Sequence, residues 1–150
     1  MLQKVGLPAL ADGALLKTDS FIDGAWVPAA SGARFVVHNP ADGLKLAEVA
    51  NAGPAEAAQA IAAAARAMPA WRGKTAKERA AVLRKWFELI LASQEDLAKL
   101  MTAEQGKPLT ESRGEVVYGA SFIEWFAEEA KRVYGETIPT TDPNKRFVIL

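Results

Sequence analysis

The first fifty residues alternate short apolar runs with turn-forming residues, which is typical of short β-strands. Apolar pairs at 21–22 and 26–27 stand on either side of Asp23-Gly24, a dipeptide that accepts the positive φ angles of a tight hairpin turn. Further apolar runs at 34–37 and 46–49 follow the same pattern. The sequence therefore predicts a small antiparallel sheet in this region.

After residue 53 the apolar residues recur every three or four positions, which indicates amphipathic helices. Pro54 suits a first helical turn because it has no N–H to satisfy. Thr75 and Glu78 form a capping box that marks a second helix, and Ser93 is expected to cap a third, which stops at Gly106. The side chains expected to face inward are Ile61, Ala64, Ala65, Met68, Val82, Leu83, Trp86, Phe87, Leu89, Ile90, Leu97, Leu100 and Met101.

The segment 104–135 is expected to be helical for most of its length and to carry two apolar faces. One face consists of Val116, Ala120, Ile123, Ala127 and Ala130, and the other consists of Tyr118, Phe122 and Trp125. Two apolar faces predict two neighbouring structures. Gly114 and Gly119 each cost a helix interior about 1 kcal/mol relative to alanine, so we expect a close packing contact that compensates. The expected solvated edge consists of Glu124, Glu128, Glu129, Lys131 and Arg132.

The last part of the chain changes character again. Gly135 is expected to end the long helix, and residues 136–145 read as a polar connector. The apolar run at 146–150 then reads as a strand, and because no turn or cap follows it, we expect that more chain comes after it.

Composition excludes several classes of function. The 18 basic and 18 acidic residues give a net charge of zero, which argues against a nucleic-acid or anionic-membrane partner. The absence of cysteine excludes disulfides, Cys-ligated zinc and a thiol nucleophile within these 150 residues. The apolar stretches are shorter than the roughly 20 residues of a membrane span. Pro8 and Asp12 interrupt the N-terminal stretch, so no signal peptide is expected and we expect a cytoplasmic protein.

The residues present do not form a recognisable active site. His38, the only histidine, stands beside a turn and is expected to be structural. Gly106-Lys107 lacks the other residues of a phosphate-binding P-loop. The carboxylate pairs at 95–96 and 128–129 are adjacent along helices, so they point in different directions and are expected to be solvated. No catalytic, cofactor-binding or metal-ligating residue is predicted from the residues alone.

Five blocks that follow one another along the chain carry a stronger signal: FIDGAWV, NPADG, TAKERAAVLRKW, LMTAEQGKPLTESRGEV and FIEWFAEEAKRVYGETIP. From about Phe21 to Leu150 the chain resembles the N-terminal part of the aldehyde dehydrogenase superfamily, and within it the bacterial NADP-preferring succinate-semialdehyde dehydrogenases. The resemblance implies an α/β fold in which a small β-hairpin region precedes a helical layer, with the doubly wound cofactor sheet mostly beyond residue 150. It assigns residues 1–135 to the N-terminal part of the cofactor-binding domain and residues 136–150 to the start of an oligomerisation β-arm.

The resemblance also implies a chemistry. Such enzymes attack an aldehyde with a cysteine thiolate, pass hydride to NADP or NAD, and hydrolyse the thioester with a water that a glutamate activates. None of those residues can be carried over onto this sequence, so catalysis and the NADP or NAD site are expected in residues beyond this chain. The long helix does carry over, with Tyr118, Ser121 and Phe122 as candidates for the wall of the aldehyde tunnel. Ordinary interdomain packing is the alternative for Tyr118, Phe122 and Trp125.

The implied function is oxidation of succinate semialdehyde to succinate by a homo-oligomer, a dimer or a tetramer, of the full-length protein. Two alternatives stay open. One is an aldehyde dehydrogenase for another small aldehyde such as glutarate semialdehyde, because the groups that recognise the substrate carboxylate would lie outside these residues. The other is a non-catalytic helical interaction module, which would be monodisperse by itself, whereas part of a larger enzyme would expose apolar faces and aggregate.

Overall fold

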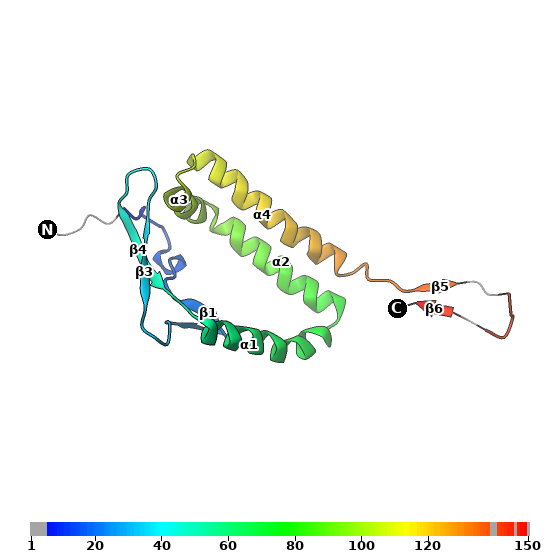
Figure 1. Ribbon diagram of the computed structural model, residues 1–150. Helices are drawn as coiled ribbons and strands as arrows, with labels where there is room; N and C mark the ends of the chain where they lie inside the picture. Colours follow the sequence, from blue (N-terminus) through cyan, green and yellow to red (C-terminus); the bar gives the residue numbers. More distant parts are fainter. Residues whose placement is uncertain (1–5, 139–140, 146, 150) are drawn as a thin grey trace.

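The computed structural model describes residues 6–138, 141–145 and 147–149, and Figure 1 shows their arrangement. Within these residues a small hairpin region precedes a helical layer, in the α/β order that the sequence predicts. The strands are β1 (Ser20–Ile22), β2 (Ala25–Val27), β3 (Arg34–His38), β4 (Lys45–Ala50), β5 (Glu136–Ile138) and β6 (Phe147–Ile149). The helices are α1 (Pro54–Arg72), α2 (Ala76–Ala92), α3 (Gln94–Gln105) and α4 (Leu109–Glu129), with a 3-10 turn at Gly13–Leu15.

Turn chemistry determines where the first hairpin reverses. Asp23 and Gly24 have φ angles of 53° and 83°, and positive φ at both positions gives a two-residue turn the twist of the strands it joins. β1 and β2 therefore pair with Phe21 opposite Trp26, and the centroids of these two rings lie 5.1 Å apart. The predicted hairpin is confirmed.

The predicted strands are confirmed, but they form two separate two-stranded sheets instead of one sheet. β3 pairs antiparallel with β4, with an irregularity between Val37 and His38. Between β2 and β3 the chain turns at Gly32, which has a φ angle of 70° and whose N–H donates to the Ala29 carbonyl oxygen at 2.8 Å. One backbone hydrogen bond, 2.8 Å from Ala50 N to Thr18 O, still connects the two hairpins.

The helix ends follow local rules at most positions. Thr75 Oγ1 accepts the Glu78 N–H at 3.3 Å and Glu78 Oε2 accepts the Thr75 N–H at 2.7 Å, so the predicted capping box begins α2. Gly106 ends α3 with a φ angle of 75°. Ser93 stands at the predicted N-cap position of α3, but its hydroxyl makes no cap hydrogen bond. With φ −102° and ψ 11°, Ser93 lacks the extended backbone of an N-cap and instead joins α2 directly to α3.

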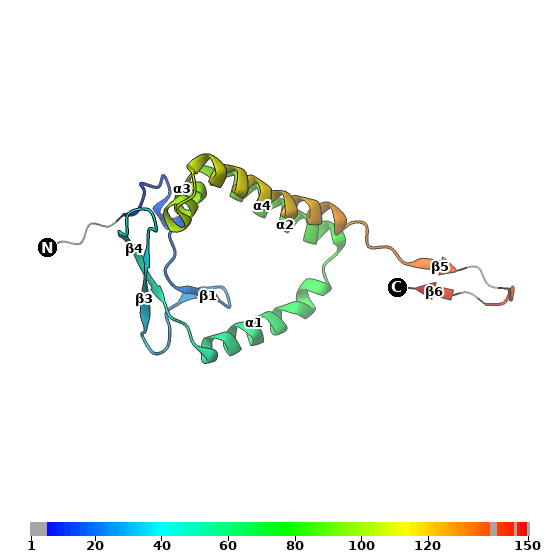
Figure 2. The ribbon, with the colours of Figure 1, turned by 45° about the horizontal axis from the view of Figure 1, so that its top comes forward.

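Small side chains form most of the helical core. α2 and α4 lie side by side and run in opposite directions, and α3 crosses their end (Figures 1 and 2). The buried apolar residues of the helices are Ala63, Ala80, Ala98, Ala103, Val116, Ala120 and Ala127. Alanines let helix backbones approach closely, so this layer depends on tight contact between helices. Thr102 of α3 and Ser112 of α4 share a 2.8 Å hydrogen bond in the same core. The inward face of α4 is confirmed.

Several side chains expected to face inward are exposed. The prediction is wrong for Ile61, Ala64, Ala65, Met68, Val82, Trp86 and Leu89. The partly buried members are Leu83, Phe87, Ile90, Leu97, Leu100 and Met101. α2 packs on α4 over one narrow face, so Val82, Trp86 and Leu89 stay about half exposed on its other side. α1 lies apart from α2 and α4 in both views (Figures 1 and 2), so its stripe is exposed as well.

Gly114 and Gly119 lack the close neighbour that the sequence predicts. A Cβ atom added at either position would meet no atom within 4 Å among the described residues. The predicted packing contact is therefore wrong for this part of the chain, and both glycines leave α4 with the unfavourable backbone entropy of glycine in a helix.

Replacing Gly119 with alanine is expected to raise the free energy of unfolding by up to about 1 kcal/mol, since alanine favours the helix and meets open space. Urea denaturation of the full-length protein measures this change. As a control, Gly106→Ala places a Cβ at a φ angle of 75° and 3.1 Å from Pro40 Cγ, so it is expected to destabilise. A loss of stability in Gly119→Ala would show that another surface packs on this position.

The polar connector expected at 136–145 is wrong at its start. Glu136–Ile138 forms β5, which pairs antiparallel with β6 so that Thr137 lies opposite Val148. β-branched residues favour strands, which explains the extra strand. Residues 139–140, 146 and 150 lie outside the described residues, so the predicted strand at 146–150 is confirmed over Phe147–Ile149. This hairpin extends away from the end of α4 (Figure 1).

Candidate functional site

Four aromatic side chains cover one side of α4, and we call them the aromatic face: Tyr118, Phe122, Trp125 and Phe126. Spacings of four, seven and eight residues place them on one side of the helix. They are 65%, 49%, 62% and 58% exposed, in that order. The Tyr118 and Phe122 rings meet edge to face, with centroids 4.9 Å apart and planes at 82°, which is a favourable geometry for an aromatic pair.

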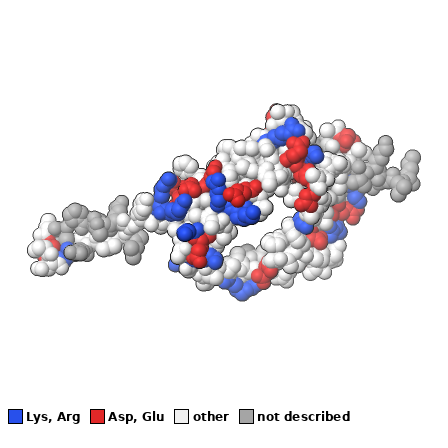
Figure 3. Space-filling model, turned by 180° about the vertical axis from the view of Figure 1, so that it is seen from behind, with Lys and Arg blue, Asp and Glu red and all other residues white. Residues whose placement is uncertain are grey.

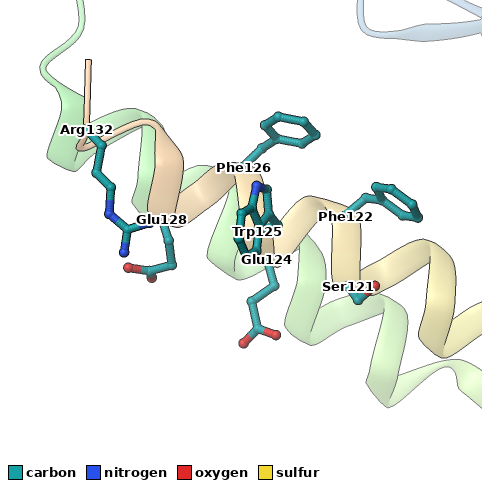
Figure 4. Close-up of a pocket in the computed structure, with 7 residues that line it drawn as sticks. All are labelled: Ser121, Phe122, Glu124, Trp125, Phe126, Glu128 and Arg132. Atoms are coloured by element: carbon teal, nitrogen blue, oxygen red, sulfur yellow. The ribbon is translucent and has the colours of Figure 1, made fainter. Parts of the chain in front are cut away.

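A hollow of about 710 Å³ lies beside the C-terminal half of α4 (Figure 4). The residues that line it are Ser121, Phe122, Glu124, Trp125, Phe126, Glu128 and Arg132. Figure 4 shows the rings of Phe122 and Phe126 on one side of the helix and the carboxylates of Glu124 and Glu128 on another. Of the predicted tunnel residues, Ser121 and Phe122 line the hollow, whereas Tyr118 lies outside its lining and contacts Phe122. The volume suits a small ligand or a side chain from another segment.

The charged side chains around this hollow are paired. The ion pairs are Glu124–Arg84 at 2.7 Å, Glu128–Lys131 at 2.6 Å, and Glu129–Arg132. The hydrogen bond from Lys131 lowers the pKa of Glu128, so this carboxylate is ionised at neutral pH. An ionised carboxylate held in an ion pair is a weak general base. The hollow therefore offers shape and apolar surface for binding, and its charged groups form the solvated edge that the sequence predicts.

The Ser121 hydroxyl is engaged by its own helix. Ser121 Oγ donates to the Tyr118 carbonyl oxygen at 2.7 Å, a bond that serine commonly makes inside helices. His38, the only histidine, lies on β3 with Nδ1 3.1 Å from the Gly43 carbonyl oxygen, so it belongs to the β3–β4 turn as predicted. No histidine is available within this chain to activate Ser121, so a serine–histidine nucleophile is excluded here.

Asp96, which the sequence places in a solvated carboxylate pair, is buried at 5% exposure. Its Oδ1 and Oδ2 accept the N–H groups of Ala11 and Asp12 at 3.0 Å and 2.9 Å. The N–H groups of Asp12 and Ala11 lower the pKa of Asp96. Because these partners lie 84 and 85 residues away along the chain, no local pattern reports them. Glu95 is exposed as expected and pairs with Arg113 at 2.7 Å.

Glu56 is a second buried carboxylate, at 6% exposure, near the start of α1. Its two oxygens accept the N–H groups of Ala30 at 2.9 Å and Gly53 at 2.7 Å. The N–H groups of Ala30 and Gly53 lower the pKa of Glu56. Glu56 therefore joins the N-terminus of α1 to the loop between β2 and β3. The sequence offers one signal for this role, a glutamate at the third position of a helix that begins with Pro54.

Replacing Glu56 with glutamine is expected to lower the melting temperature at pH 7, because a neutral amide accepts these N–H groups less strongly. The folded-state pKa lies below the unfolded one, so the stability from Glu56 is present at neutral pH. It is lost as the pH falls from about 5 through the lowered pKa. Melting curves of both proteins between pH 7 and pH 3 should therefore converge on acidification. Glu111→Gln, at an exposed position, serves as the control, and a constant difference would contradict this account.

The surface as a whole carries mixed charge. Figure 3 shows acidic and basic side chains next to one another over the back of the molecule, without a large region of one sign. Among the described residues, no helix combines the length and apolar character needed to cross a membrane. The same residues contain no group of three His, Cys, Asp or Glu side chains arranged to hold a metal ion. The aromatic face and its hollow are therefore the strongest candidate site on this part of the chain.

The sequence profile of the aldehyde dehydrogenase family matches residues 26–150. The chain belongs to the aldehyde dehydrogenase family. A solved aldehyde dehydrogenase structure, the succinate-semialdehyde dehydrogenase from Burkholderia pseudomallei, superimposes with a TM-score of 0.90 at 55% identity and covers 94% of this chain. The predicted N-terminal part of an aldehyde dehydrogenase fold is thereby confirmed.

Curated relatives of this aldehyde dehydrogenase chain carry three different substrate names. The glutarate-semialdehyde dehydrogenase of Pseudomonas aeruginosa is 53% identical over 141 residues, 94% of this chain. The 3-sulfolactaldehyde dehydrogenase of Pseudomonas putida is 56% identical over 140 residues, 93% of this chain. The succinate-semialdehyde dehydrogenase (NADP(+)) of Escherichia coli is 53% identical over 141 residues, 94% of this chain. The chain spans 29% of the length of each of these three relatives and of the Burkholderia structure.

Proposed function

We propose that this chain is the N-terminal part of an NAD(P)-dependent aldehyde dehydrogenase that oxidises succinate semialdehyde to succinate. The observation that carries the proposal is the family match over residues 26–150 together with relatives at 53% identity or more. The family's cysteine nucleophile is not among these 150 residues, which contain no cysteine. In this proposal the chain contributes the shape of the site, and the remainder of the enzyme contributes the chemistry.

The names of the relatives support a substrate class. Glutarate semialdehyde, succinate semialdehyde and 3-sulfolactaldehyde are short aldehydes with an acid group away from the aldehyde carbon. Glutarate semialdehyde is the second candidate substrate, because the relatives named for it and for succinate semialdehyde are both 53% identical to this chain. The proposed class is therefore a small aldehyde with a remote anionic group.

Within this proposal, Tyr118, Ser121 and Phe122 form part of the wall along which the aldehyde passes. The exposed Tyr118–Phe122 pair supports this role, since two rings in edge-to-face contact present a continuous apolar surface. Ser121 Oγ, which donates to Tyr118 O, still has lone pairs that can accept a hydrogen bond at the hollow. These residues would orient the aldehyde and exclude water. They would not take part in making or breaking bonds.

The residues described here do not fit a nicotinamide dinucleotide. A dinucleotide phosphate commonly binds the N–H groups at the start of a helix that follows a strand. At the corresponding place, between β4 and α1, the Gly53 N–H already donates to the buried Glu56 carboxylate at 2.7 Å. A fixed negative charge there opposes a phosphate. The proposed NADP or NAD would therefore be bound by residues beyond this chain.

The proposal assigns residues 1–135 to the cofactor-binding domain and residues 136–150 to a β-arm through which cytoplasmic subunits associate. The exposed Phe147, Val148 and Ile149 support this arm, at 54%, 59% and 51% exposure, because apolar strands with free edges pair with other chains. The full-length protein is then expected to be a dimer or a tetramer, and Val148→Lys is expected to weaken it. Light scattering after size-exclusion chromatography measures the mass, and a monomeric wild type would contradict the arm.

The test of the function is a kinetic comparison on the full-length gene product. Reduction of NADP and of NAD is followed spectrophotometrically with succinate semialdehyde, glutarate semialdehyde, 3-sulfolactaldehyde and butanal, which lacks the acid group. We expect the highest kcat/KM with succinate semialdehyde and the lowest with butanal. Higher kcat/KM with glutarate semialdehyde would select the second candidate, and no reduction with any aldehyde would refute the proposal.

A further inference from the structure

The described start of the chain, residues 6–16, lies between the β3–β4 hairpin and α3, and we call it the N-terminal strap. At one end the Gly6 N–H donates to the Lys45 carbonyl oxygen of β4 at 2.9 Å. At the other end Ala11 and Asp12 donate to Asp96 of α3. The strap therefore connects two elements that are far apart along the chain.

The attachment to α3 consists of a few polar contacts around one carboxylate. Asp96 receives both strap N–H groups, and Lys99 Nζ donates to the Ala9 carbonyl oxygen at 3.1 Å. Lys99 Nζ also lies 3.7 Å from Asp96 Oδ1. The Asp12 carboxylate is used within the strap, where its Oδ1 accepts the Ala14 N–H at 2.9 Å. Asp96 is thus the acceptor for both strap N–H groups that bind α3.

The strap also covers apolar surface. Leu7 and Leu16 of the strap, together with Leu46, Leu100 and Ala103 from β4 and α3, line a cavity of about 30 Å³. Leu46 is 3% exposed and Ala103 is 7% exposed. If the strap lifts, these side chains of β4 and α3 lose part of their cover. The strap therefore determines whether Leu46, Leu100 and Ala103 are covered.

We propose that the N-terminal strap is a latch that opens and closes as one unit while the helical layer stays folded, and that the Asp96 carboxylate holds it closed. The physical basis is the difference between the two kinds of attachment. α2, α3 and α4 pack through buried side chains that include Ala80, Ala98 and Ala120. The strap contains no fully buried residue, and a few hydrogen bonds and the side chains of Leu7 and Leu16 hold it in place. Segments attached in this way open locally, at a lower free energy than global unfolding.

Amide hydrogen exchange of the full-length protein, followed by mass spectrometry, tests the latch. In Asp96→Asn one of the two oxygens that accept the strap N–H groups becomes an NH2 group, which donates and does not accept, so one strap N–H loses its acceptor. Protection factors of peptides covering 7–16 are expected to fall about tenfold or more, while those of α2 and α4 stay at wild-type values. Glu95→Gln is the matched control, because this neighbouring carboxylate binds Arg113 and not the strap.

A second variant alters the strap without changing Asp96. A Cβ on Gly6 would lie 2.9 Å from Leu44 Cβ, so Gly6→Ala is expected to loosen the other end and lower strap protection. Gly13→Ala is its control, because a Cβ there meets no described atom within 4 Å. Unchanged protection of 7–16 in Asp96→Asn would overturn the latch. So would an equal loss in α2 and α4 in either variant, because the strap would then be part of the global core.

Discussion

Replacing Tyr118 with alanine in the full-length enzyme is expected to raise KM for the aldehyde about tenfold, with kcat nearly unchanged. Tyr118 is 65% exposed and contacts Phe122 on the same face of α4, so its ring contributes little to the packing of this part of the chain. A wall residue contributes to binding of the substrate and of the transition state alike, which is why KM should change and kcat should not. Steady-state kinetics with succinate semialdehyde and urea denaturation of the same preparations measure both effects.

Two matched variants sharpen this test. Tyr118→Phe keeps the ring and removes the hydroxyl, so its KM should stay near the wild-type value if the ring forms the wall. Tyr134→Ala makes the same truncation at a residue that is 78% exposed beyond the end of α4, and its KM should also stay unchanged. A large loss of stability in Tyr118→Ala with unchanged kinetics would assign Tyr118 to interdomain packing.

Replacing Ala120 with leucine is expected to lower the free energy of unfolding by about 2 kcal/mol or more. Ala120 is 1% exposed on the inward face of α4, and because protein interiors are closely packed, three further carbon atoms are expected to overfill this contact. To accept leucine, α4 must move away from its neighbours, which also disturbs the Thr102–Ser112 hydrogen bond. The change is measured as a shift of the urea midpoint of the full-length protein.

The control for this substitution is Ala92→Leu, which adds the same atoms at an exposed position at the end of α2. Its effect is expected to stay within about 0.5 kcal/mol, as for most surface substitutions. If both variants lose equal stability, the cause is the intrinsic cost of leucine and not the tight contact at Ala120.

Local rules predict a large part of this fold because their causes lie within a few residues. The Asp23-Gly24 turn, the Thr75–Glu78 box and the Gly106 stop each depend on neighbours along the chain, and the structure confirms all three. The helical period likewise predicts which residues share a face of α4. Ser93 shows the limit, because its cap depends on a backbone angle that two abutting helices determine.

Burial is less predictable because it depends on partners outside the local pattern. Val82, Trp86 and Leu89 form an apolar stripe as clear as the one that packs, yet the described residues leave it exposed. Asp96 shows the reverse, since the sequence places it in a solvated carboxylate pair, and Glu56 is marked only by its place at the third position of α1. Their partners are backbone N–H groups, which every residue except proline carries, so no residue type marks them. A three-dimensional contact is needed to find them.

The candidate site, too, can be predicted from the sequence only in part. The spacing of Tyr118 and Phe122 predicts that they share a face, and the two rings do meet. Phe126, four residues beyond Phe122, lines the same hollow. The helical spacing places it on this face too, although the sequence prediction names only Tyr118, Phe122 and Trp125 there. The role of Tyr118, Ser121 and Phe122 as a tunnel wall stays a prediction, because the opposite wall would come from residues beyond this chain.

The joint at Ser93 restricts how this protein can be altered. Its N–H bonds to the Leu89 and Ile90 carbonyl oxygens at 3.1 Å, and its own carbonyl accepts the Leu97 N–H at 3.0 Å, so two helices share one residue. A single inserted residue would turn α3 by about 100° around its axis and carry Asp96 out of reach of the strap. Fluorescent labels and epitope insertions therefore belong in the Asp23-Gly24 turn, where extra length changes no helix phase.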